Sequence, residues 1–168
     1  MATIKGLKRL QKKLDKLPDA AKKRIREAME KGADEIVGMM QNLVPIGDTM
    51  RLHDSIGWTW GRAPKGSMTI GKVESTGGDL TITIYAGDDE AWYSRFVEFG
   101  TAPHNAASGG GTKAGQKQLA SGGGLGHPGS AAQPFFFVSY RANRKRVKSR
   151  ITRAINKAAK DVAAGGGS

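Results

Sequence analysis

The stretch Trp92-Tyr93-Ser94-Arg95-Phe96-Val97-Glu98-Phe99-Gly100-Thr101 is the segment around which we expect the chain to fold. Its pattern fits either a helix or a strand. Trp92, Phe96 and Phe99 share one helical stripe, with Arg95 beside them, and this spacing favours a short helix. We therefore predict a helix within residues 91–100 that runs into an extended Gly-Thr exit.

Glu98 is the one acid of this stretch, and its two neighbours, Val97 and Phe99, are apolar. A general acid with a raised pKa is one interpretation. Such a role usually needs a second acid at a recognisable spacing, and the sequence offers none. We expect Glu98 to pair with Arg95, or with a basic residue of another subunit.

Downstream of the stretch, residues 101–132 contain nine glycines and no apolar periodicity. A segment of this composition buries too little surface to offset the entropy of ordering it. Irregular loops of this length are uncommon inside compact domains. We predict a Gly-rich arm that is either ordered by a partner or a mobile insertion.

Beyond the arm, Gln133-Pro134-Phe135-Phe136-Phe137 restores a dense apolar cluster. It leads into a predicted helix from about 138 to 162, within a C-terminal part spanning 133–162. This helix has a narrow apolar stripe at Val147, Ile151, Ile155 and Ala158. We expect Phe96, Phe99, Phe135 and Phe136 to form the core, or its contact with a neighbouring subunit.

Upstream of the stretch, residues 56–86 change to a period of two, which predicts strands. Ile56, Trp58 and Trp60 alternate with small or polar residues, and Leu80, Ile82 and Ile84 form the clearest strand. A weaker strand is expected over 67–74, with a turn at 76–79. The short gaps favour an antiparallel sheet, because parallel pairs need long crossovers.

Residues 1–45 form the predicted helical N-terminal part. One apolar stripe runs through 3–17, and a second runs through Ile25, Met29, Ala33, Ile36, Met40 and Leu43. Pro18 suits the first turn of the second helix. Pro45 ends it, because proline cannot donate a backbone hydrogen bond. The fold class is therefore α+β, with a small antiparallel sheet packed against N-terminal and C-terminal helices.

Length and composition limit the possible functions. A chain of 168 residues is most simply one domain, 1–168. With no cysteine, disulfides and thiolate metal sites are excluded. The N-terminus lacks the apolar core of a signal peptide, and no window approaches the roughly 18 apolar residues of a membrane span. We expect a soluble protein made in a cytoplasm.

The net charge of +12 is concentrated at the two ends of the chain. Residues 1–31 carry a net charge of +7 and residues 137–168 a net charge of +8, whereas residues 32–136 carry −3. This asymmetry is consistent with nucleic-acid contact. It also fits basic ends that dock on the acidic face of a neighbouring subunit, or simply a solvated helix surface.

Two histidine-containing patterns raise the question of catalysis or metal binding. His53-Asp54-Ser55 names the residues of a hydrolase triad, but adjacent side chains point apart, so we interpret Asp54 and Ser55 as turn or capping residues. His104 and His127 could meet across the arm, but no cysteine or neighbouring carboxylate completes a metal site. We predict no catalytic residue, no metal, no cofactor and no small-molecule substrate.

Three segments together resemble one protein family. Residues 44–56 are similar to its segment Pro-Val-Asp-Thr-Gly-x-Leu-x-x-Ser-Ile, and residues 93–101 to its signature Tyr-Ala-x-Phe/Tyr-Val-Glu-Phe-Gly-Thr. Residues 132–136 resemble its Ala-x-Pro-Phe-Leu segment before the last helix. The family is that of the neck and minor-tail proteins of long-tailed bacteriophages, called tail-completion, tail-terminator or head–tail joining proteins. Two departures are Met50, where the family usually has Gly after Asp-Thr, and the length of the Gly-rich insertion.

The resemblance implies a non-enzymatic subunit of the virion, assembled in the bacterial cytoplasm. It implies a ring, usually hexameric, at the junction between tail tube and head, with the tail-tube protein and a head-closure or connector protein as partners and DNA passing through the lumen. The residues it marks as core or subunit interface are Tyr93, Arg95, Phe96, Val97, Glu98, Phe99, Gly100, Thr101, Pro134, Phe135 and Phe136. The alternatives are a basic nucleic-acid-binding module and, less well supported, a hydrolase.

Overall fold

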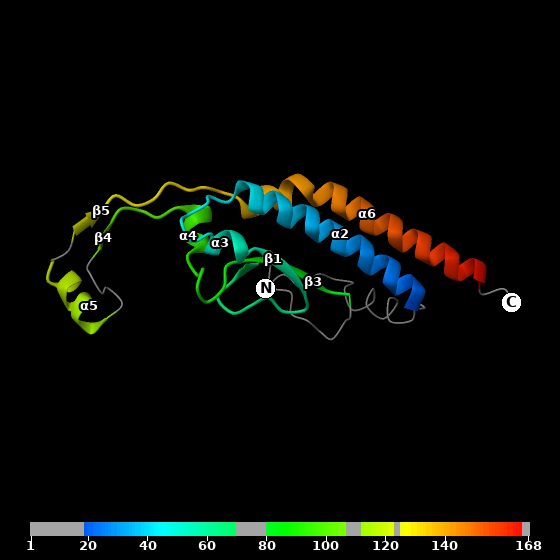
Figure 1. The fold of residues 1–168 in the computed structure, drawn as a ribbon, viewed down its shortest axis with the longest axis horizontal. Helices are drawn as coiled ribbons and strands as arrows, with labels where there is room; N and C mark the ends of the chain where they lie inside the picture. The colour runs from blue at the N-terminus through cyan, green and yellow to red at the C-terminus, as the bar shows by residue number, and fades with distance from the viewer. Residues whose placement is uncertain (1–18, 70–79, 107–111, 123–124, 166–168) are drawn as a thin grey trace.

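The computed structural model describes residues 19–69, 80–106, 112–122 and 125–165. Two long helices lie side by side along the molecule, a small sheet lies against them, and an arm extends from one end (Figure 1). The predicted α+β class is confirmed. The first predicted apolar stripe, the strand residues from 70 to 74 and the turn at 76–79 lie outside the described residues.

Helix α2, Asp19–Leu43, confirms the second predicted helix. Asp19 lies in its first turn, where a negative charge is favourable, and the helix ends two residues before Pro45. Its buried residues recur every three or four positions, which is the spacing of one helical face. They are Ala21, Ile25, Ala28, Gly32, Ala33, Ile36 and Met40.

Helix α6, Phe136–Gly165, packs along α2 and begins two residues before the predicted start. Charged side chains link the two helices. Glu35 of α2 lies 2.5 Å from Arg150 and 3.0 Å from Arg146, and Arg24 pairs with Asp161. The hydrogen bond from Arg150 lowers the pKa of the Glu35 carboxyl, although burial opposes the shift.

Close packing of α2 on α6 requires a glycine at position 32. A Cβ atom on Gly32 would lie 2.6 Å from Val147 Cγ1, whereas a Cβ atom on Gly38 would meet nothing within 4 Å. We expect Gly32→Ala to destabilise the protein by about 1 kcal/mol or more, because overpacking outweighs the gain in helix propensity. Gly38→Ala is the matched control and should stabilise by about 0.5–1 kcal/mol. Urea unfolding of the two variants measures both effects, and equal effects would contradict this packing.

The sheet consists of β1 (Gly57–Trp60), β2 (Met68–Thr69) and β3 (Ile82–Ala86) in the order β1-β3-β2. Both pairings are antiparallel, as predicted, with Trp58 opposite Ile84 and Met68 opposite Ala86. The indole nitrogens of Trp58 and Trp60 donate to Asp34 and Glu30 of α2, at 2.7 and 3.3 Å. The alternating tryptophans therefore attach the sheet to the long helix.

The main core lies where α2, the sheet, the short helix α3 (Arg51–Asp54) and the start of α6 meet. Phe135, Phe136, Met40 and Ala86 are completely buried in it. The other buried members are Ile36, Val44, Leu52, Ile56, Met68 and Ala91. A smaller cluster of Ala21, Ile25 and Ala158 continues between the two long helices. This arrangement places the beginning of α6, and the segment just before it, at the centre of the fold.

Candidate interaction surface

Helix α4, Ser94–Phe99, confirms the short helix predicted in the aromatic stretch. The inward-facing side of α4 is polar: its buried residues are Ser94 and Glu98. Glu98 is only 4% exposed. Its Oε2 accepts hydrogen bonds from the backbone amides of Phe135 and Phe136, both at 2.8 Å, and its Oε1 accepts one from Phe137 at 3.1 Å.

These three amides stand at the start of α6, where backbone N–H groups have no partner within the helix. A carboxylate is well suited to this position, because it accepts hydrogen bonds and complements the positive end of the helix dipole. The basic partner expected for Glu98 is therefore replaced by backbone amides 37 to 39 residues away. One side chain thus joins α4 to α6.

The outward side of α4 is aromatic. Trp92 is 60% exposed, Phe96 48% and Phe99 64%. We call these three residues the aromatic patch. Trp92 meets Phe96 edge-on at 5.7 Å between ring centroids, and Phe99 lies 5.8 Å from Phe137. The structure divides the four phenylalanines that we expected in the core or at its contact with a neighbour: Phe135 and Phe136 are core, whereas Phe96 and Phe99 lie on the surface.

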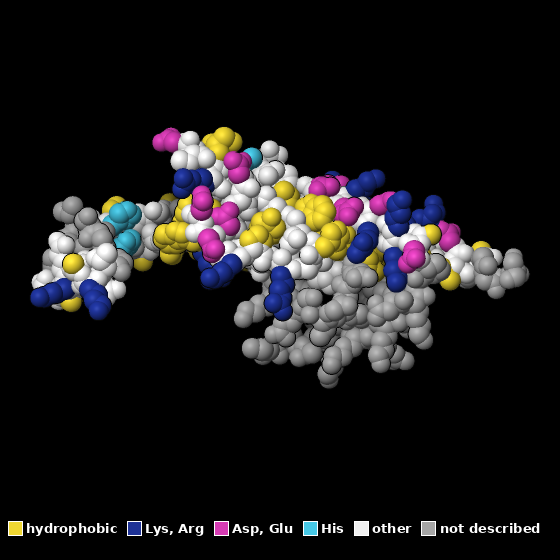
Figure 2. All heavy atoms as spheres, turned by 60° about the horizontal axis from the view of Figure 1, so that its bottom comes forward, with side chains coloured by type: hydrophobic (Ala, Val, Ile, Leu, Met, Phe, Trp, Pro, Cys, Tyr) yellow, Lys and Arg dark blue, Asp and Glu magenta, His cyan; other side chains and the backbone are white. Residues whose placement is uncertain are grey.

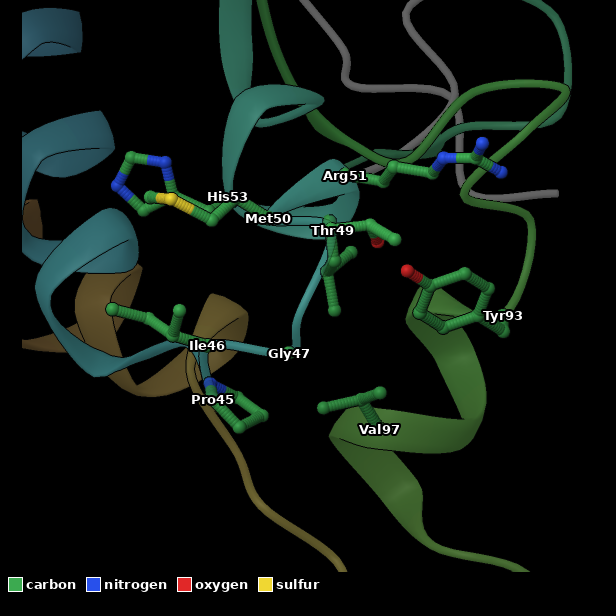
Figure 3. A pocket seen from close by; sticks show the side chains of 10 residues that line it. Pro45, Ile46, Gly47, Thr49, Met50, Arg51, His53, Tyr93 and Val97 are labelled. Carbon is green, nitrogen blue, oxygen red and sulfur yellow. The ribbon is translucent and has the colours of Figure 1, made fainter.

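A pocket of about 210 Å³ opens beside α4. Val97 of α4 and Tyr93, which immediately precedes this helix, line one side, and the connection between α2 and α3 lines the other (Figure 3). In this view Pro45 and Val97 approach each other, and the Tyr93 hydroxyl points toward Thr49. Two lining residues, Ile46 and Met50, are themselves exposed, at 68% and 41%. The pocket and the aromatic patch together make one end of the body unusually apolar.

The Gly-Thr pair at the end of the stretch forms the base of the arm. Gly100 has φ +73°, and a Cβ atom there would lie 2.6 Å from Ser130 O, so glycine suits both the conformation and the space. The Thr101 amide donates to Ser130 O at 2.9 Å, and the Ser130 amide donates to Thr101 O at 3.2 Å. The outgoing and returning chains are therefore joined where they leave the body.

The arm itself contains regular structure. Strands β4 (His104–Ala106) and β5 (Leu125–His127) pair antiparallel, and helix α5 (Lys113–Ala120) lies at the tip (Figure 1). Thr112 caps α5, because its hydroxyl accepts a hydrogen bond from the Gly115 amide at 3.2 Å. Sequence periodicity did not reveal these three elements of the predicted Gly-rich arm. Short strands and a capped helix satisfy backbone groups without the apolar periodicity that a sequence pattern reveals.

His104 and His127 do meet, as foreseen, opposite each other in the β4–β5 ladder. Their rings stack with centroids 5.0 Å apart. His104 Nδ1 lies 3.0 Å from Ala102 O, and His127 Nδ1 accepts a hydrogen bond from the Gly129 amide. Within the described residues, no three His, Cys, Asp or Glu side chains are grouped so that they could hold a metal ion.

The His53-Asp54-Ser55 segment has the turn role that we predicted. Ser55 is buried, and its hydroxyl donates to Leu52 O at 2.8 Å and accepts from the Gly87 amide at 3.2 Å. His53 instead contacts Asp54, at 2.9 Å. The three side chains are not linked in the order Ser–His–Asp that a hydrolase triad requires.

An acidic turn precedes the aromatic patch. Asp88 Oδ1 accepts from the amides of Glu90 and Ala91, which orders the turn. Asp89 and Glu90 are exposed, and Glu90 lies 3.8 Å from the equally exposed Arg51. Figure 2 shows acidic side chains beside hydrophobic ones at the end of the body from which the arm leaves. Negative charge and apolar surface therefore occur together here.

The predicted site residues take three different positions. Glu98, Phe135 and Phe136 are buried, and Tyr93 and Val97 are half-buried at the pocket. The others lie at the surface or at the base of the arm: Arg95, Phe96, Phe99, Gly100, Thr101 and Pro134. Sequence reasoning missed Ile46 and Met50, which face the same pocket. Both residues lie in segment 44–56, and its similarity to a family segment could have indicated them.

The structure also bears on Met50, which is one of the two departures from the family pattern. It has φ +51°, the left-handed conformation that glycine adopts most easily. This is the position at which the resembled family usually has glycine. The turn conformation has therefore been kept with a methionine side chain, which contributes to the apolar end of the body.

Comparison with known proteins gives the class and the family. A model built on bacteriophage proteins matches residues 8–100, more than half of the chain. The α+β chain with its exposed aromatic surface is thus a bacteriophage tail component, a protein of the virion. More particularly, it belongs to the HK97-gp10-like family, described as "Bacteriophage HK97-gp10, putative tail-component". Neither a curated protein nor a solved structure matches the chain.

The family match ends at Gly100, the residue at which the arm begins. The described helices include none with the length and apolar character needed to cross a membrane. The matched part contains α2, α3, the sheet and α4. The arm and α6 lie outside the matched residues, so they are described from the structure alone.

Proposed function

We propose that this chain forms a ring, most simply a hexamer, at the neck or top of the tail, where it completes the tail and joins it to the head. Its partners in this proposal are further copies of itself, the tail-tube protein and a head-closure or connector protein. It performs no catalysis. The proposal is supported by membership of a tail-component family and by the surface of α4.

The observation that carries this proposal is the exposure of the aromatic patch. Six of the eight large hydrophobic side chains that are exposed among the described residues lie on α4, just before it, or on the stretch from the end of α2 to α3. They are Leu43, Ile46, Met50, Trp92, Phe96 and Phe99. Apolar patches of this kind mark interaction sites, and aromatic residues are enriched there. A protein contact would remove this surface from water.

An experiment in the phage tests the proposed role. Phage carrying Trp92→Ala and Phe96→Ala together should yield at least tenfold fewer joined particles, with unjoined heads and tails visible in electron micrographs. The purified variant should keep its thermal unfolding midpoint, because both side chains are exposed. The control is Val162→Ala, which shortens another exposed apolar side chain, near the far end of α6.

Two outcomes would contradict the proposal. One is normal joining by the double variant when the folded variant protein is present in the particle. The other is a tag on the chain that appears at the tail tip, or along the tube, rather than at the junction with the head.

A second candidate is DNA binding by α6, within a ring through which DNA passes or as a separate module. Helix α6 carries nine Lys or Arg residues and one acid, Asp161. Exposed bases include Arg144, Lys145 and Lys148. If α6 contacts phosphates, binding of the purified protein to duplex DNA should fall steeply with salt. Binding that is absent at low salt would exclude this candidate.

A further inference from the structure

The described part of the arm extends away from the rest of its own chain. β4 and β5 pair with each other, and Figure 1 shows them and α5 beyond the end of α4, away from the sheet and the two long helices. Its root is held by the paired backbones of Thr101 and Ser130. In this arrangement α5 faces whatever lies next to the molecule.

The tip of the arm has one sign of charge. Residues 101–132 contain two lysines and no acid. Lys113 and Lys117 are four residues apart on α5, hence on one face of the helix, and both are exposed. Leu119, near the end of the same helix, is half-buried. Figure 2 shows the two basic side chains together at the tip. Leu119 lies on the opposite side of the helix from the two lysines, so the exposed face of the tip suits a surface that carries negative charge.

An acidic surface of this kind lies on the body, near the root of the arm. The exposed carboxylates of Asp89 and Glu90 directly precede Trp92 and Phe96, and the pocket beside α4 is lined by Ile46 and Met50. Arg51, 3.8 Å from Glu90, and the exposed Arg95 of α4 are basic groups at the same end, and Glu90 remains 75% exposed at its side chain. The carboxylates of this surface are complementary in charge to the lysines of the arm tip.

We propose that the arm tip of one copy docks on the α4 surface of a second copy. Lys113 and Lys117 lie against Asp89 and Glu90 of that copy, which places α5 beside Trp92 and Phe96. Because the donor surface and the acceptor surface differ, the contact is head-to-tail, and repetition of such a contact closes a ring when the rotation permits. The inference rests on the proposed function in that it requires several copies to assemble.

The absence of cysteine allows a direct test by cross-linking. One preparation carries Lys117→Cys and a second carries Asp89→Cys, and the two are mixed before a short bis-maleimide reagent is added. A product of twice the chain mass should form in the mixture and at least tenfold less in either preparation alone. A mixture with Glu27→Cys, an exposed position on α2, in place of Asp89→Cys is the control and should give no such product.

Charge reversal tests the same contact without a reagent. Lys113→Glu with Lys117→Glu should weaken self-association at least tenfold in analytical ultracentrifugation. A second protein carrying Asp89→Lys with Glu90→Lys should restore association when mixed with the first. Failure of this rescue, together with the absence of cross-linked dimer both in the purified protein and in assembled particles, would overturn the inference.

The outcomes separate this inference from the proposed function. A chain that lies at the neck but cross-links from position 117 to a different tail protein would overturn the docking between copies and leave the neck role standing. Cross-linked copies located elsewhere in the tail would support the docking and contradict the neck role.

Discussion

Glu98→Gln is expected to lower the free energy of unfolding by about 2–4 kcal/mol. The buried carboxylate accepts hydrogen bonds from three backbone amides, whereas a glutamine side chain carries one acceptor group and one donor group. Glutamine has one oxygen, and its NH2 group would face an amide that also donates. At least one of the amides of Phe135, Phe136 and Phe137 would then lose its acceptor. Urea unfolding, followed by circular dichroism, measures the change.

The control for this prediction is Glu27→Gln, which removes the same charge from an exposed position on α2. It should change the free energy of unfolding by no more than about 0.5 kcal/mol. If both glutamine variants unfolded at the same urea concentration, Glu98 would not be the cap of α6 that the structure describes.

Phe136→Ala is expected to destabilise the protein by about 3–5 kcal/mol, since the ring is fully buried and its removal leaves a cavity. The ring packs edge-on against Phe135 at 6.4 Å and Phe137 at 5.3 Å between centroids. A loss of this size is a large share of the stability of a typical domain. The same unfolding measurement detects it, and the purified variant should also bind a hydrophobic dye.

The matched control is Phe99→Ala, which removes the same side chain from a position 64% exposed. It should cost less than about 1 kcal/mol in the isolated protein, and its effect should appear in assembly instead. A Phe99→Ala variant as unstable as Phe136→Ala would mean that the aromatic patch belongs to the core.

Periodicity was sufficient to predict the main regular elements of the body, but not β4, α5 and β5 of the arm. The stripe in α2, the alternation in β1 and β3, and the short helix at α4 all follow from side-chain spacing. The strand order β1-β3-β2 was not predictable in this way, because antiparallel neighbours need not follow each other in the chain. Pairing depends on contacts between segments, which local patterns do not record.

The orientation of α4 shows why the candidate surface was only partly predictable. The stripe left open whether Phe96 and Phe99 belong to the core or to its contact with a neighbour. In the structure Trp92, Phe96 and Phe99 are exposed and Glu98 is buried. A carboxylate can be buried when its oxygens are fully hydrogen-bonded. Its donors lie in α6, so neither the burial of Glu98 nor the exposure of the aromatic residues could be inferred from the stretch alone.

The root of the arm has a mechanical consequence. Glu98, which caps the first turn of α6, is only two residues from Gly100, where the chain leaves the body, and Gln133 of the returning chain donates its amide to Val97 O at 2.8 Å. A load applied at the paired Thr101 and Ser130 would therefore be shared between two backbone connections to the body, and one of them leads directly into α6.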